Sequence, residues 1–231
     1  MKGKQVLLTG GTGGLGLGVT PAVLARGAVV TIPYQRETNL QRLKNKLPAA
    51  DFARIRFVKA DLYGESVVEQ LVNDLGRVDV LIHLVGGFSM GRTDEFSFEL
   101  WQESFNLNLN TTFLLCKHCL RMMRQQGYGR IVTVASRAAE KPAAQLAAYS
   151  AAKAGVVALT KAIAAETIDL DITANTVLPG IIDTPSNREA MGSADADKWV
   201  KPESLGEVIC FLASAAAKDV SGATIPVYGV S

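Results

Sequence analysis

Tyr149 and Lys153, in the alanine-rich segment AAYSAAKAG (147–155), have side chains whose types and spacing could support acid–base chemistry. Residues four apart lie on one face of a helix, so we expect the phenol and the ammonium to project side by side. An ammonium close to a phenol favours the phenolate and lowers the phenol pKa from its usual value of about 10. Tyr149 is thereby predicted to give or accept a proton near neutral pH. A surface tyrosine beside a solvated lysine is the alternative.

The elements that must position this pair are predicted by short apolar runs that alternate with helical patterns. Continuous Val, Ile and Leu runs are typical of strands covered on both faces, and strands that alternate with helices indicate a parallel sheet. We predict strands at 4–10, 28–33, 54–60, 79–85, 130–136, 171–179 and 223–229. We predict helices near 15–26, 38–47, 64–76, 98–126, 147–168 and 202–213.

The composition excludes several classes of protein. The 231 residues are 48% hydrophobic and carry a net charge of +2, without the basic block of a nucleic-acid binder. No apolar run approaches the ~18 residues that cross a bilayer, and the start MKGKQVLLTGG lacks the regions of a signal peptide. Three cysteines suit a reducing cytosol better than a disulfide framework. We therefore expect a single cytoplasmic domain over residues 1–231, with no nucleic-acid or membrane partner.

Cys116 and Cys119, in the segment CKHC, form the one pair that suggests a redox or metal site. Their surroundings, TTFLLCKHCLRMM, predict the middle of a long helix and not the helix start that lowers a thiol pKa. Outside this segment the only histidine is His83, so a second cluster of ligands is missing. We predict that both thiols pack in the core and that the protein has no metal site.

A glycine-rich turn follows the first predicted strand. In TGGTGGLGLG, the residues Thr9, Gly10, Gly14 and Gly16 have the spacing TGxxxGxG. Glycines allow a tight turn and a close approach of the backbone to a pyrophosphate, which then sits at the N-terminal end of the next helix. The turn follows a strand and opens a helix, which is the context that a dinucleotide-binding loop requires.

Taken together, these motifs resemble the short-chain dehydrogenase/reductase family over essentially the whole chain. In family order stand TGxxxGxG at 9–16, Asp61-Leu62, a glycine turn after the fourth strand, Asn108 in NLNTTF, Ser136, YSAAK at 149–153 and PGIIDT at 179–184. The resemblance implies an α/β, three-layer Rossmann fold, with a doubly wound parallel sheet of about seven strands in a single domain. It also implies an enzyme that transfers hydride between NAD(P) and a carbonyl or alcohol substrate.

The resemblance assigns catalytic roles to Asn108, Ser136, Tyr149 and Lys153. Tyr149 resembles the general acid/base, and Lys153 resembles the lysine that lowers its pKa and holds the nicotinamide ribose. Ser136 would hydrogen-bond the substrate oxygen, and Asn108 would support a water and proton relay behind Lys153. Donors already in place for a developing alkoxide are worth about 10²–10³ in rate.

The cofactor contacts follow from the same resemblance. Asp61 would accept a hydrogen bond from the adenine amino group, Ile182 would meet the nicotinamide carboxamide through its backbone, and Thr184 would reach the amide or a phosphate. The full set predicted to bind the cofactor is Gly10, Thr12, Gly13, Gly14, Leu15, Gly16, Tyr34, Gln35, Arg36, Asp61, Leu62, Val85, Gly86, Tyr149, Lys153, Pro179, Ile182 and Thr184.

Two segments depart from the family pattern. Where the family has Asn-Asn-Ala-Gly after the fourth strand, this chain has HLVG (83–86), and we expect His83 to be packed or partly exposed and not catalytic. The second strand ends in PYQRE (33–37), with Tyr34 where an acidic residue would bind the ribose of NAD. Nothing acidic is expected there to repel a 2′-phosphate, and Arg36 could attract one. We therefore favour NADP(H), with NAD(H) as the alternative.

The segment 183–202, DTPSNREAMGSADADKWVKP, is the candidate substrate loop, because it would emerge beyond the carboxyl ends of the strands. The core motifs resemble the 3-oxoacyl-carrier-protein reductase type, whereas segments 85–91 and 182–203 resemble the branch that includes dihydropteridine reductase. Pterin reduction is therefore one alternative function, and a catalytically idle dinucleotide-binding protein is another. A mixed apolar pocket could be lined by Phe88, Met90, Arg137, Met191 and Trp199.

Two long predicted helices, at 98–126 and 147–168, carry apolar residues on more than one face. These residues include Phe113, Leu114, Val156, Val157 and Leu159. The family resemblance places such faces in a four-helix contact, so we expect a homodimer or a homotetramer.

Overall fold

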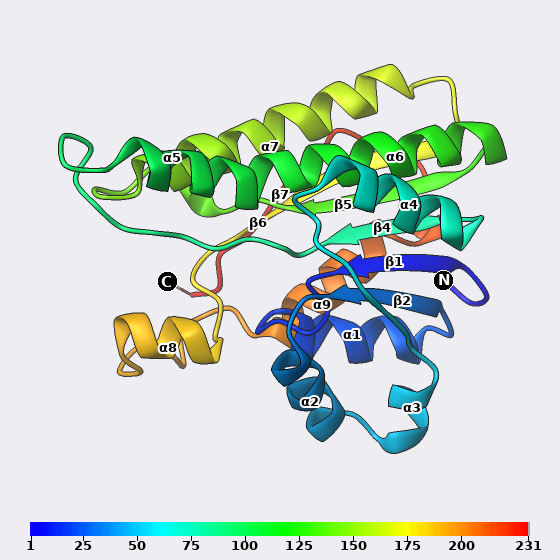
Figure 1. Cartoon of the computed structure of the whole chain (residues 1–231), viewed down its shortest axis with the longest axis horizontal. Coiled ribbons are helices and arrows are strands. Elements are labelled where there is room, and N and C mark those ends of the chain that lie inside the picture. Colours follow the sequence, from blue (N-terminus) through cyan, green and yellow to red (C-terminus); the bar gives the residue numbers. More distant parts are fainter. Residues whose placement is uncertain (231) are drawn as a thin grey trace.

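Residues 1–230, the part of the chain that the computed structural model describes, contain one seven-stranded sheet. All neighbouring strands run parallel, in the order β3-β2-β1-β4-β5-β6-β7. This arrangement confirms the predicted doubly wound α/β fold (Figure 1). The strands are β1 (Gln5–Thr9), β2 (Val29–Tyr34), β3 (Arg56–Lys59), β4 (Val80–His83), β5 (Gly129–Val134), β6 (Ile172–Pro179) and β7 (Thr224–Val227).

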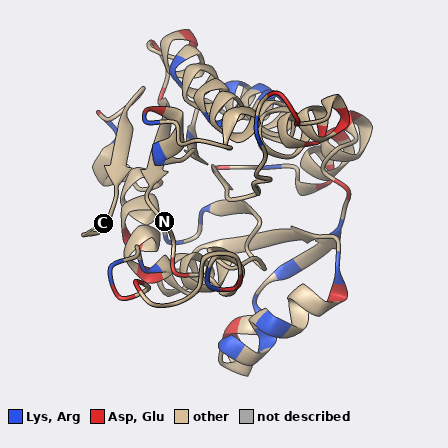
Figure 2. Ribbon diagram, turned by 90° about the vertical axis from the view of Figure 1, so that its left-hand side faces the viewer, with Lys and Arg blue, Asp and Glu red and all other residues tan. Residues whose placement is uncertain are grey.

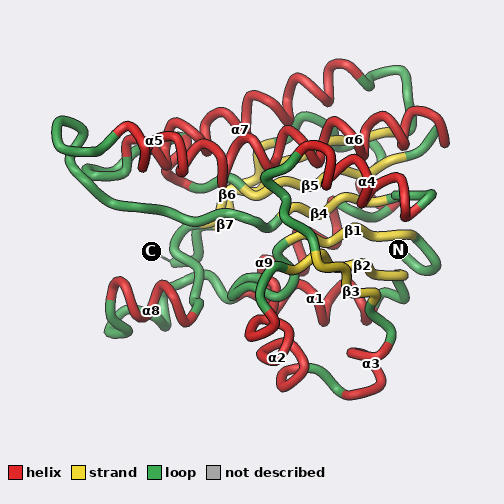
Figure 3. The backbone as a smooth tube through the Cα atoms, viewed as in Figure 1, coloured by secondary structure: helices red, strands yellow, loops and turns green. Residues whose placement is uncertain are grey.

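Helices cover both faces of the sheet, so the described residues form three layers (Figure 3). A π-helical turn joins α5 to α6, and two 3₁₀ turns lie at Arg137–Ala139 and Ala215–Ala217. The helices are α1 (Gly16–Ala25), α2 (Glu37–Lys46), α3 (Ala49–Ala53), α4 (Glu65–Leu75), α5 (Phe98–Phe105), the π-helical turn (Asn106–Asn110), α6 (Thr111–Gln126), α7 (Ala147–Glu166), α8 (Pro185–Met191) and α9 (Pro202–Leu212).

Two large hydrophobic cores, one on each face of the sheet, hold the layers together, and a smaller cluster is formed by Ala135, Val156 and Leu178. In β1, Val6 and Leu8 pack with α1, α2 and α9, whereas Leu7 between them packs with α4, α6 and α7. Because successive side chains of a strand point to opposite faces, strands buried on both faces appear in the sequence as unbroken apolar runs. Full burial of a side chain such as Leu8 contributes about 1.5–3 kcal/mol. The cores therefore fix the strand register on which the site depends.

The carboxyl ends of the strands lie at one edge of the sheet, since all the strands are parallel. The strand order reverses between β1 and β4, because the chain proceeds outward from β1 to β3 and then returns to β4. In open α/β sheets, ligands bind beside such a switch point. The loops after β1, β4, β5 and β6, which carry half of the predicted site residues, leave the sheet at this edge.

Basic and acidic residues are both spread along the helices and loops (Figure 2). This distribution agrees with the nearly balanced sequence, which has 24 Lys and Arg against 22 Asp and Glu. Among the helices of residues 1–230, none has the length and apolarity that a bilayer-crossing segment needs.

Three local features differ from the sequence prediction. The helix predicted at 98–126 is divided by the π-helical turn (Asn106–Asn110) into α5 and α6. Helix α3 was not expected; it begins directly after Pro48. Helix α8 lies inside the segment predicted to be an irregular loop, where Thr184 caps its N-terminus and Pro185 takes its first position. A short helix with this capping pattern is too brief for apolar periodicity to reveal it.

Candidate active site

Helix α7 carries Tyr149 in its first turn and Lys153 one turn later, so both side chains lie at the carboxyl edge of the sheet. Lys153 is 4% exposed, and its Nζ donates a hydrogen bond of 2.9 Å to the carbonyl oxygen of Val134, the last residue of β5. The ammonium lies 5.9 Å from the centre of the Tyr149 ring. The predicted pair on one helix face is thus present, with the lysine anchored to the sheet.

The electrostatics of this pair differ from the sequence-based expectation. Burial raises the pKa of Tyr149, and a hydrogen bond with the Ser136 side chain only partly opposes this rise. Burial also lowers the pKa of Lys153 to about 8. The prediction that the pKa of Tyr149 lies below its usual value is therefore wrong for this structure, because desolvation outweighs the hydrogen bond with Ser136. At neutral pH, Tyr149 is a protonated phenol.

Ser136 follows β5 by two residues and lies beside Tyr149. Its Oγ accepts a hydrogen bond of 3.2 Å from the backbone N–H of Ala138, so the serine caps the 3₁₀ turn at Arg137–Ala139. This bond uses the hydroxyl as an acceptor and leaves its proton available for donation. The strand end and the cap together fix the hydroxyl next to the phenol.

Asn108 occupies the middle of the π-helical turn and is fully buried. Its Nδ2 donates to the carbonyl oxygens of Gly87 and Ser104, each at 2.9 Å, and its Oδ1 accepts from the N–H of Gly87 at 3.2 Å. π-Helical turns inside α-helices occur frequently at functional sites. Here the turn gives one asparagine side chain three hydrogen bonds, of which the two with Gly87 tie the helix to the loop after β4.

Gly86 brings Lys153 and Asn108 together. A methyl group at its Cα would lie 2.8 Å from Lys153 Nζ and 2.9 Å from Asn108 Oδ1. Both distances are shorter than real Cβ contacts, so only glycine leaves room for the two polar groups. The predicted catalytic residues thus lie in one region: Tyr149 contacts Ser136, and Lys153 and Asn108 both lie next to Gly86 in the loop after β4.

The glycine-rich turn has the close backbone packing that a phosphate loop requires. Gly10 has a φ of +74°, and a methyl group at Gly16 would lie 2.4 Å from the Gly10 carbonyl oxygen. The N–H of Gly13 donates to the same carbonyl oxygen at 2.9 Å. Thr12 is buried, and Leu15 immediately precedes α1. The turn therefore brings the N-terminus of α1, the end of a helix that favours anions, to the edge of the sheet.

An acidic side chain from the first turn of α2 lies against Tyr34, the last residue of β2. The Tyr34 hydroxyl donates to Glu37 Oε1 at 3.0 Å, so a carboxylate lies beside the predicted ribose position. Tyr34 is the last residue of β2, as predicted, and the Glu37 carboxylate reaches its hydroxyl from the first turn of α2. Gln35 donates to Asp61 Oδ1 at 2.9 Å, and Arg36 is exposed directly before α2.

The other predicted cofactor residues occupy neighbouring loops. Leu62 is buried after β3, Val85 is half-buried after β4, and Pro179 is the last residue of β6. A methyl group at Gly14 would lie 2.9 Å from the side chain of Thr184, so the glycine-rich turn meets the segment after β6. Thr184 Oγ1 accepts from the N–H of Asn187 at 3.2 Å, which leaves its hydroxyl proton free to donate.

The candidate substrate loop is closed at its base. Ile182 and Val200 form a parallel β-bridge, and the N–H of Asp183 donates to the Val200 carbonyl oxygen at 2.8 Å. Two cations, Arg188 at 2.5 Å and Lys201 at 2.7 Å, hold the Asp183 carboxylate and keep its pKa well below the usual range. The segment predicted to cover the substrate thus contains helix α8, and its two ends are held together by the β-bridge and by the ion pair of Asp183 with Lys201.

Of the five residues predicted to line an apolar pocket, the structure brings Phe88 to the candidate site. Its ring packs edge-on against the ring of Tyr149, with the centres 6.0 Å apart. Met90 and Met191 are exposed, and Trp199 is buried. Arg137 lies over the ring of Tyr228 at 5.1 Å.

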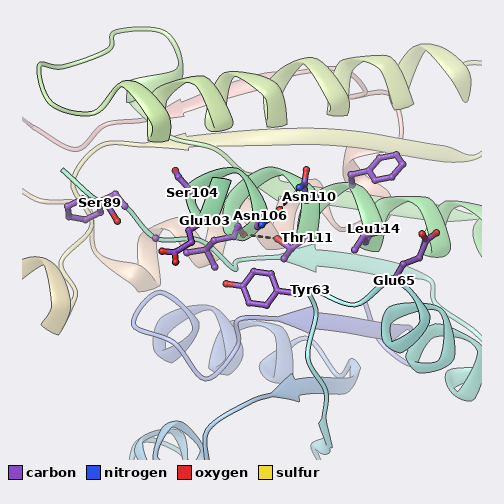
Figure 4. A pocket seen from close by; sticks show the side chains of 13 residues that line it. Tyr63, Glu65, Ser89, Glu103, Ser104, Asn106, Asn110, Thr111 and Leu114 are labelled. Atoms are coloured by element: carbon purple, nitrogen blue, oxygen red, sulfur yellow. Dashed lines mark hydrogen bonds between the residues drawn. The ribbon is translucent and has the colours of Figure 1, made fainter. Parts of the chain in front are cut away.

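A cavity of about 900 Å³ borders the loop after β4 (Figure 4). It is lined by Gly87 and Phe88 from the loop, by Tyr63 after β3, and by side chains of α5, the π-helical turn and α6. Neither Tyr149 nor Ser136 lines it, so the cavity lies next to the candidate active site and not within it.

The two cysteines of CKHC lie in α6 and are buried and unlinked. Burial raises the pKa of the Cys116 thiol to about 12, so it stays protonated and packs as a small apolar group. Across residues 1–230, no group of three or more His, Cys, Asp or Glu side chains is arranged to hold a metal ion.

Sequence reasoning did not identify two backbone groups, the Gly87 peptide that binds Asn108 and the Val134 carbonyl that holds Lys153. Both act through main-chain atoms, which leave no residue-type signature. The double glycine at 86–87 is the one sequence signal that could have indicated a close backbone approach.

The geometry fits a dinucleotide at this edge. The glycine-rich turn meets the segment after β6 at Gly14 and Thr184, and Gly86 leaves the Lys153 ammonium open to a neighbouring group. One of its three N–H groups is used by Val134. A helix N-terminus, a tight glycine turn and a lysine with free donors are the groups that phosphates and ribose hydroxyls need.

Comparison with known proteins agrees with this geometry. A family model described as short chain dehydrogenase matches residues 4–194. The chain is 30% identical to the D-beta-hydroxybutyrate dehydrogenase of Cupriavidus necator, over 96% of this chain and 95% of that protein. It is 29% identical to the 3-oxoacyl-acyl-carrier-protein reductase FabG of Escherichia coli, over 99% of this chain and 97% of that protein.

A solved structure is similar over almost the same range. The structure of a variant of the actinorhodin polyketide ketoreductase with NADPH has a TM-score of 0.89 and 29% identity, covering 99% of this chain and 98% of that chain. The chain therefore belongs to the short-chain dehydrogenase/reductase family, oxidoreductases that act on alcohol and carbonyl groups with NAD(P).

Proposed function

We propose that the protein is an NADPH-dependent carbonyl reductase in which Tyr149 donates the proton. One observation carries the proposal: Tyr149 contacts Ser136, and the buried side chains of Lys153 and Asn108 both lie next to Gly86, at the strand edge where the glycine-rich turn ends. A protein that only bound a dinucleotide would have no need of this cluster.

The protonation states suit reduction at neutral pH. The raised pKa of Tyr149 keeps a proton on the phenol, so the group is a donor for a carbonyl oxygen that gains negative charge. Ser136, whose hydroxyl contacts the phenol and can donate a hydrogen bond, would bind the same oxygen. The bound nicotinamide supplies the hydride. Oriented donors of this kind are worth about 10²–10³ in rate.

Lys153 and Asn108 position the cofactor side of the site. The lysine keeps one N–H on Val134 and offers the others to the ribose hydroxyls, and its ammonium favours the phenolate that forms when Tyr149 gives up its proton. Asn108 holds the loop after β4 in place through Gly87. The other side of the proposed cofactor site is formed by the end of β6 and the segment after it, with Pro179, Ile182 and Thr184.

NADP(H) is the preferred cofactor in this proposal. Arg36 is exposed at the end of β2 and available for a 2′-phosphate, and the similar ketoreductase was solved with NADPH. Glu37 opposes this preference, but its carboxylate is engaged by the Tyr34 hydroxyl. The substrate is a small carbonyl or alcohol compound that contacts Phe88, whose ring lies against Tyr149.

The proposed assembly rests on apolar side chains that are exposed on α5 and α6, and the proposed cytoplasmic location rests on the three cysteines, which form no disulfide. Phe98 and Phe113 are 67% and 48% exposed on α5 and α6, and such apolar exposure favours a symmetric contact between copies. We propose a homodimer or homotetramer through this face, in the cytoplasm.

A substrate screen tests the proposal. NADPH and NADH oxidation would be followed against β-ketoacyl thioesters, quinonoid pterins, diketones and simple aldehydes, with Tyr149→Phe as the inactive control. We expect turnover of at least one carbonyl class, faster with NADPH, and none by the variant. Tight NADPH binding without turnover of any compound would favour a dinucleotide-binding protein without catalysis, and turnover of the pterins alone would favour pterin reduction.

A further inference from the structure

Gln145 has a backbone conformation that glutamine rarely adopts. Its φ is +66°, and it is the one residue other than glycine with a positive φ among residues 1–230. In this left-handed region the Cβ atom crowds the backbone, so glycine adopts it freely, asparagine and aspartate less often, and other residues seldom. Strained residues persist only where the surrounding structure holds them, and they cluster at active sites. The conformation of Gln145 therefore requires an explanation.

The turn at Gln145 leads directly into the helix of the candidate general acid. Helix α7 begins at Ala147, two residues later, and Tyr149 lies in its first turn. The carbonyl oxygen of Gln145 accepts a hydrogen bond of 3.0 Å from the backbone N–H of Gly91, in the loop after β4. The left-handed turn thus joins the chain before α7 to this loop through main-chain atoms.

The segment 87–91 of the loop is held at both of its ends. At one end, the Gly87 peptide exchanges hydrogen bonds with the side chain of Asn108. At the other end, Gly91 donates to Gln145. Phe88 lies between these two anchors, and its ring packs edge-on against the ring of Tyr149, with the centres 6.0 Å apart. The Gln145 carbonyl therefore fixes one end of the segment that presents the Phe88 ring to the candidate site.

The contact around Gly91 leaves little room for a ligand. A methyl group at Gly91 would lie 2.5 Å from the Phe96 ring, which is closer than real Cβ contacts. The space that remains between the loop, Trp101 of α5 and the start of α7 is a cavity of about 50 Å³. Small-molecule sites have about 300–1,000 Å³. Because the side chain of Gln145 is also exposed, the residue is suited to act through its backbone and not by binding a ligand.

We propose that Gln145 is a positioning residue for the substrate side of the site: its left-handed backbone aims its carbonyl at Gly91 and thereby holds Phe88 against Tyr149. The inference rests on the proposed function, in which the substrate contacts Phe88. The backbone conformation carries this role, and the amide side chain does not. Loss of the turn displaces Phe88 and leaves the glycine-rich turn in place, so it weakens the binding of substrate and not of cofactor.

Substitutions at position 145 separate the backbone from the side chain. Gln145→Gly and Gln145→Asn remove or shorten the amide and tolerate a positive φ, whereas Gln145→Val disfavours a positive φ because its Cβ is branched. We expect the first two to keep KM within about twofold of wild type for the carbonyl compound that the screen identifies. We expect Gln145→Val to raise this KM about three- to tenfold, the scale of one neutral hydrogen bond, and to leave KM for NADPH unchanged. Gln145→Thr, which is branched but polar, replaces Gln145→Val if the apolar change hinders folding.

The comparison of Gln145→Gly with Gln145→Val decides between the alternatives. An equal rise of the substrate KM in both variants would assign the role to the amide side chain and overturn the proposal. An unchanged KM in both variants would show that the turn does not position the substrate wall, which also overturns it.

A double-substitution cycle tests whether Gln145 acts through Phe88. Phe88→Ala removes the ring, so we expect Gln145→Val to change the substrate KM by less than about twofold in that background. An effect of Gln145→Val that keeps its full size without the ring would contradict the proposal.

Hydrogen exchange needs no substrate and separates this proposal from the proposed function. A peptide that covers residues 88–96 should exchange faster in Gln145→Val than in wild type and Gln145→Gly, because the Gly91 N–H loses its acceptor, while a peptide from β1 should not change. If Tyr149→Phe stays active, the proposed function fails although the exchange result can still hold. If Tyr149→Phe is inactive and Gln145→Val matches Gln145→Gly in exchange and in KM, the proposed function stands and only the positioning role of Gln145 fails.

Discussion

Replacing Gly86 by alanine should damage the site by adding a single methyl group. That group would lie 2.8 Å from Lys153 Nζ and 2.9 Å from Asn108 Oδ1, against about 3.4 Å for an ordinary contact. The ammonium must therefore retreat by about 0.6 Å, although Val134 and its own burial hold it in place. A misplacement of about 1 Å can cost 10²-fold in rate, so we expect kcat/KM for carbonyl reduction to fall ten- to a hundredfold.

The same substitution should affect stability much less. Overpacking typically costs about 1–3 kcal/mol, and the loss of glycine's freedom in the unfolded chain returns about 0.4–1 kcal/mol. A net destabilisation of about 1 kcal/mol lowers Tm by about 2–4 °C in a protein of this size. Activity should therefore fall far more than folding, which separates damage to the site from damage to the fold.

The assay compares Gly86→Ala with a matched glycine. Gly64→Ala is the control, because a methyl group there would lie 3.4 Å from Val67 Cγ2, an ordinary contact outside the site. Steady-state reduction, NADPH affinity and thermal melting would be measured for both variants. A Gly86→Ala protein whose kcat/KM stays within about twofold of wild type would refute the placement of Lys153 and Asn108 around this glycine.

The remaining predictions concern the cofactor, stability and assembly. Arg36→Ala should raise KM for NADPH by a factor that corresponds to a loss of about 1–3 kcal/mol of binding free energy, and it should leave KM for NADH nearly unchanged. Equal effects on both cofactors would place the 2′-phosphate elsewhere. Asp79 is 1% exposed; burial opposes its ionisation, but Arg77, the Gln5 N–H and Lys4 outweigh it and lower its pKa. Asp79→Asn should therefore lower the free energy of unfolding in urea by about 2–3 kcal/mol at pH 7. The difference from wild type should shrink as the pH falls below about 4, through the pKa of Asp79 in the folded protein. A difference that does not depend on pH would contradict this. Light scattering should show a dimer or tetramer that Phe113→Asp dissociates, and a wild-type monomer at micromolar concentration would exclude the proposed contact.

Sequence patterns predicted the fold because its signals are local and repeated. Each strand is an apolar run buried on both faces, and the glycine-rich turn stands between a strand and a helix. The positions of Tyr149 and Lys153 on one helix follow from their spacing. These properties appear as repeated patterns of residue types along the chain, which can be read directly from the sequence.

The features that sequence reasoning missed depend on contacts between distant segments. The raised pKa of Tyr149 reflects burial in the folded protein, and the π-helical turn around Asn108 reflects its bonds to the Gly87 backbone. Glu37 reaches Tyr34 only because α2 folds back on the end of β2. Main-chain partners and desolvation leave no pattern of residue types, so they become visible only in three dimensions.

The most direct test of the account is the rate of Tyr149→Phe in single turnover with NADPH and a substrate from the screen. The change removes one oxygen and keeps the ring against Phe88, so folding and NADPH affinity should be nearly unchanged. Tyr128→Phe is the matched control, since its ring lies under Lys4 and Arg130, away from the candidate site. We predict that Tyr149→Phe loses at least 10² in the chemical step while the control keeps its rate. A Tyr149→Phe protein that retains more than about a tenth of the wild-type rate, with chemistry limiting, would show that the proton comes from another group.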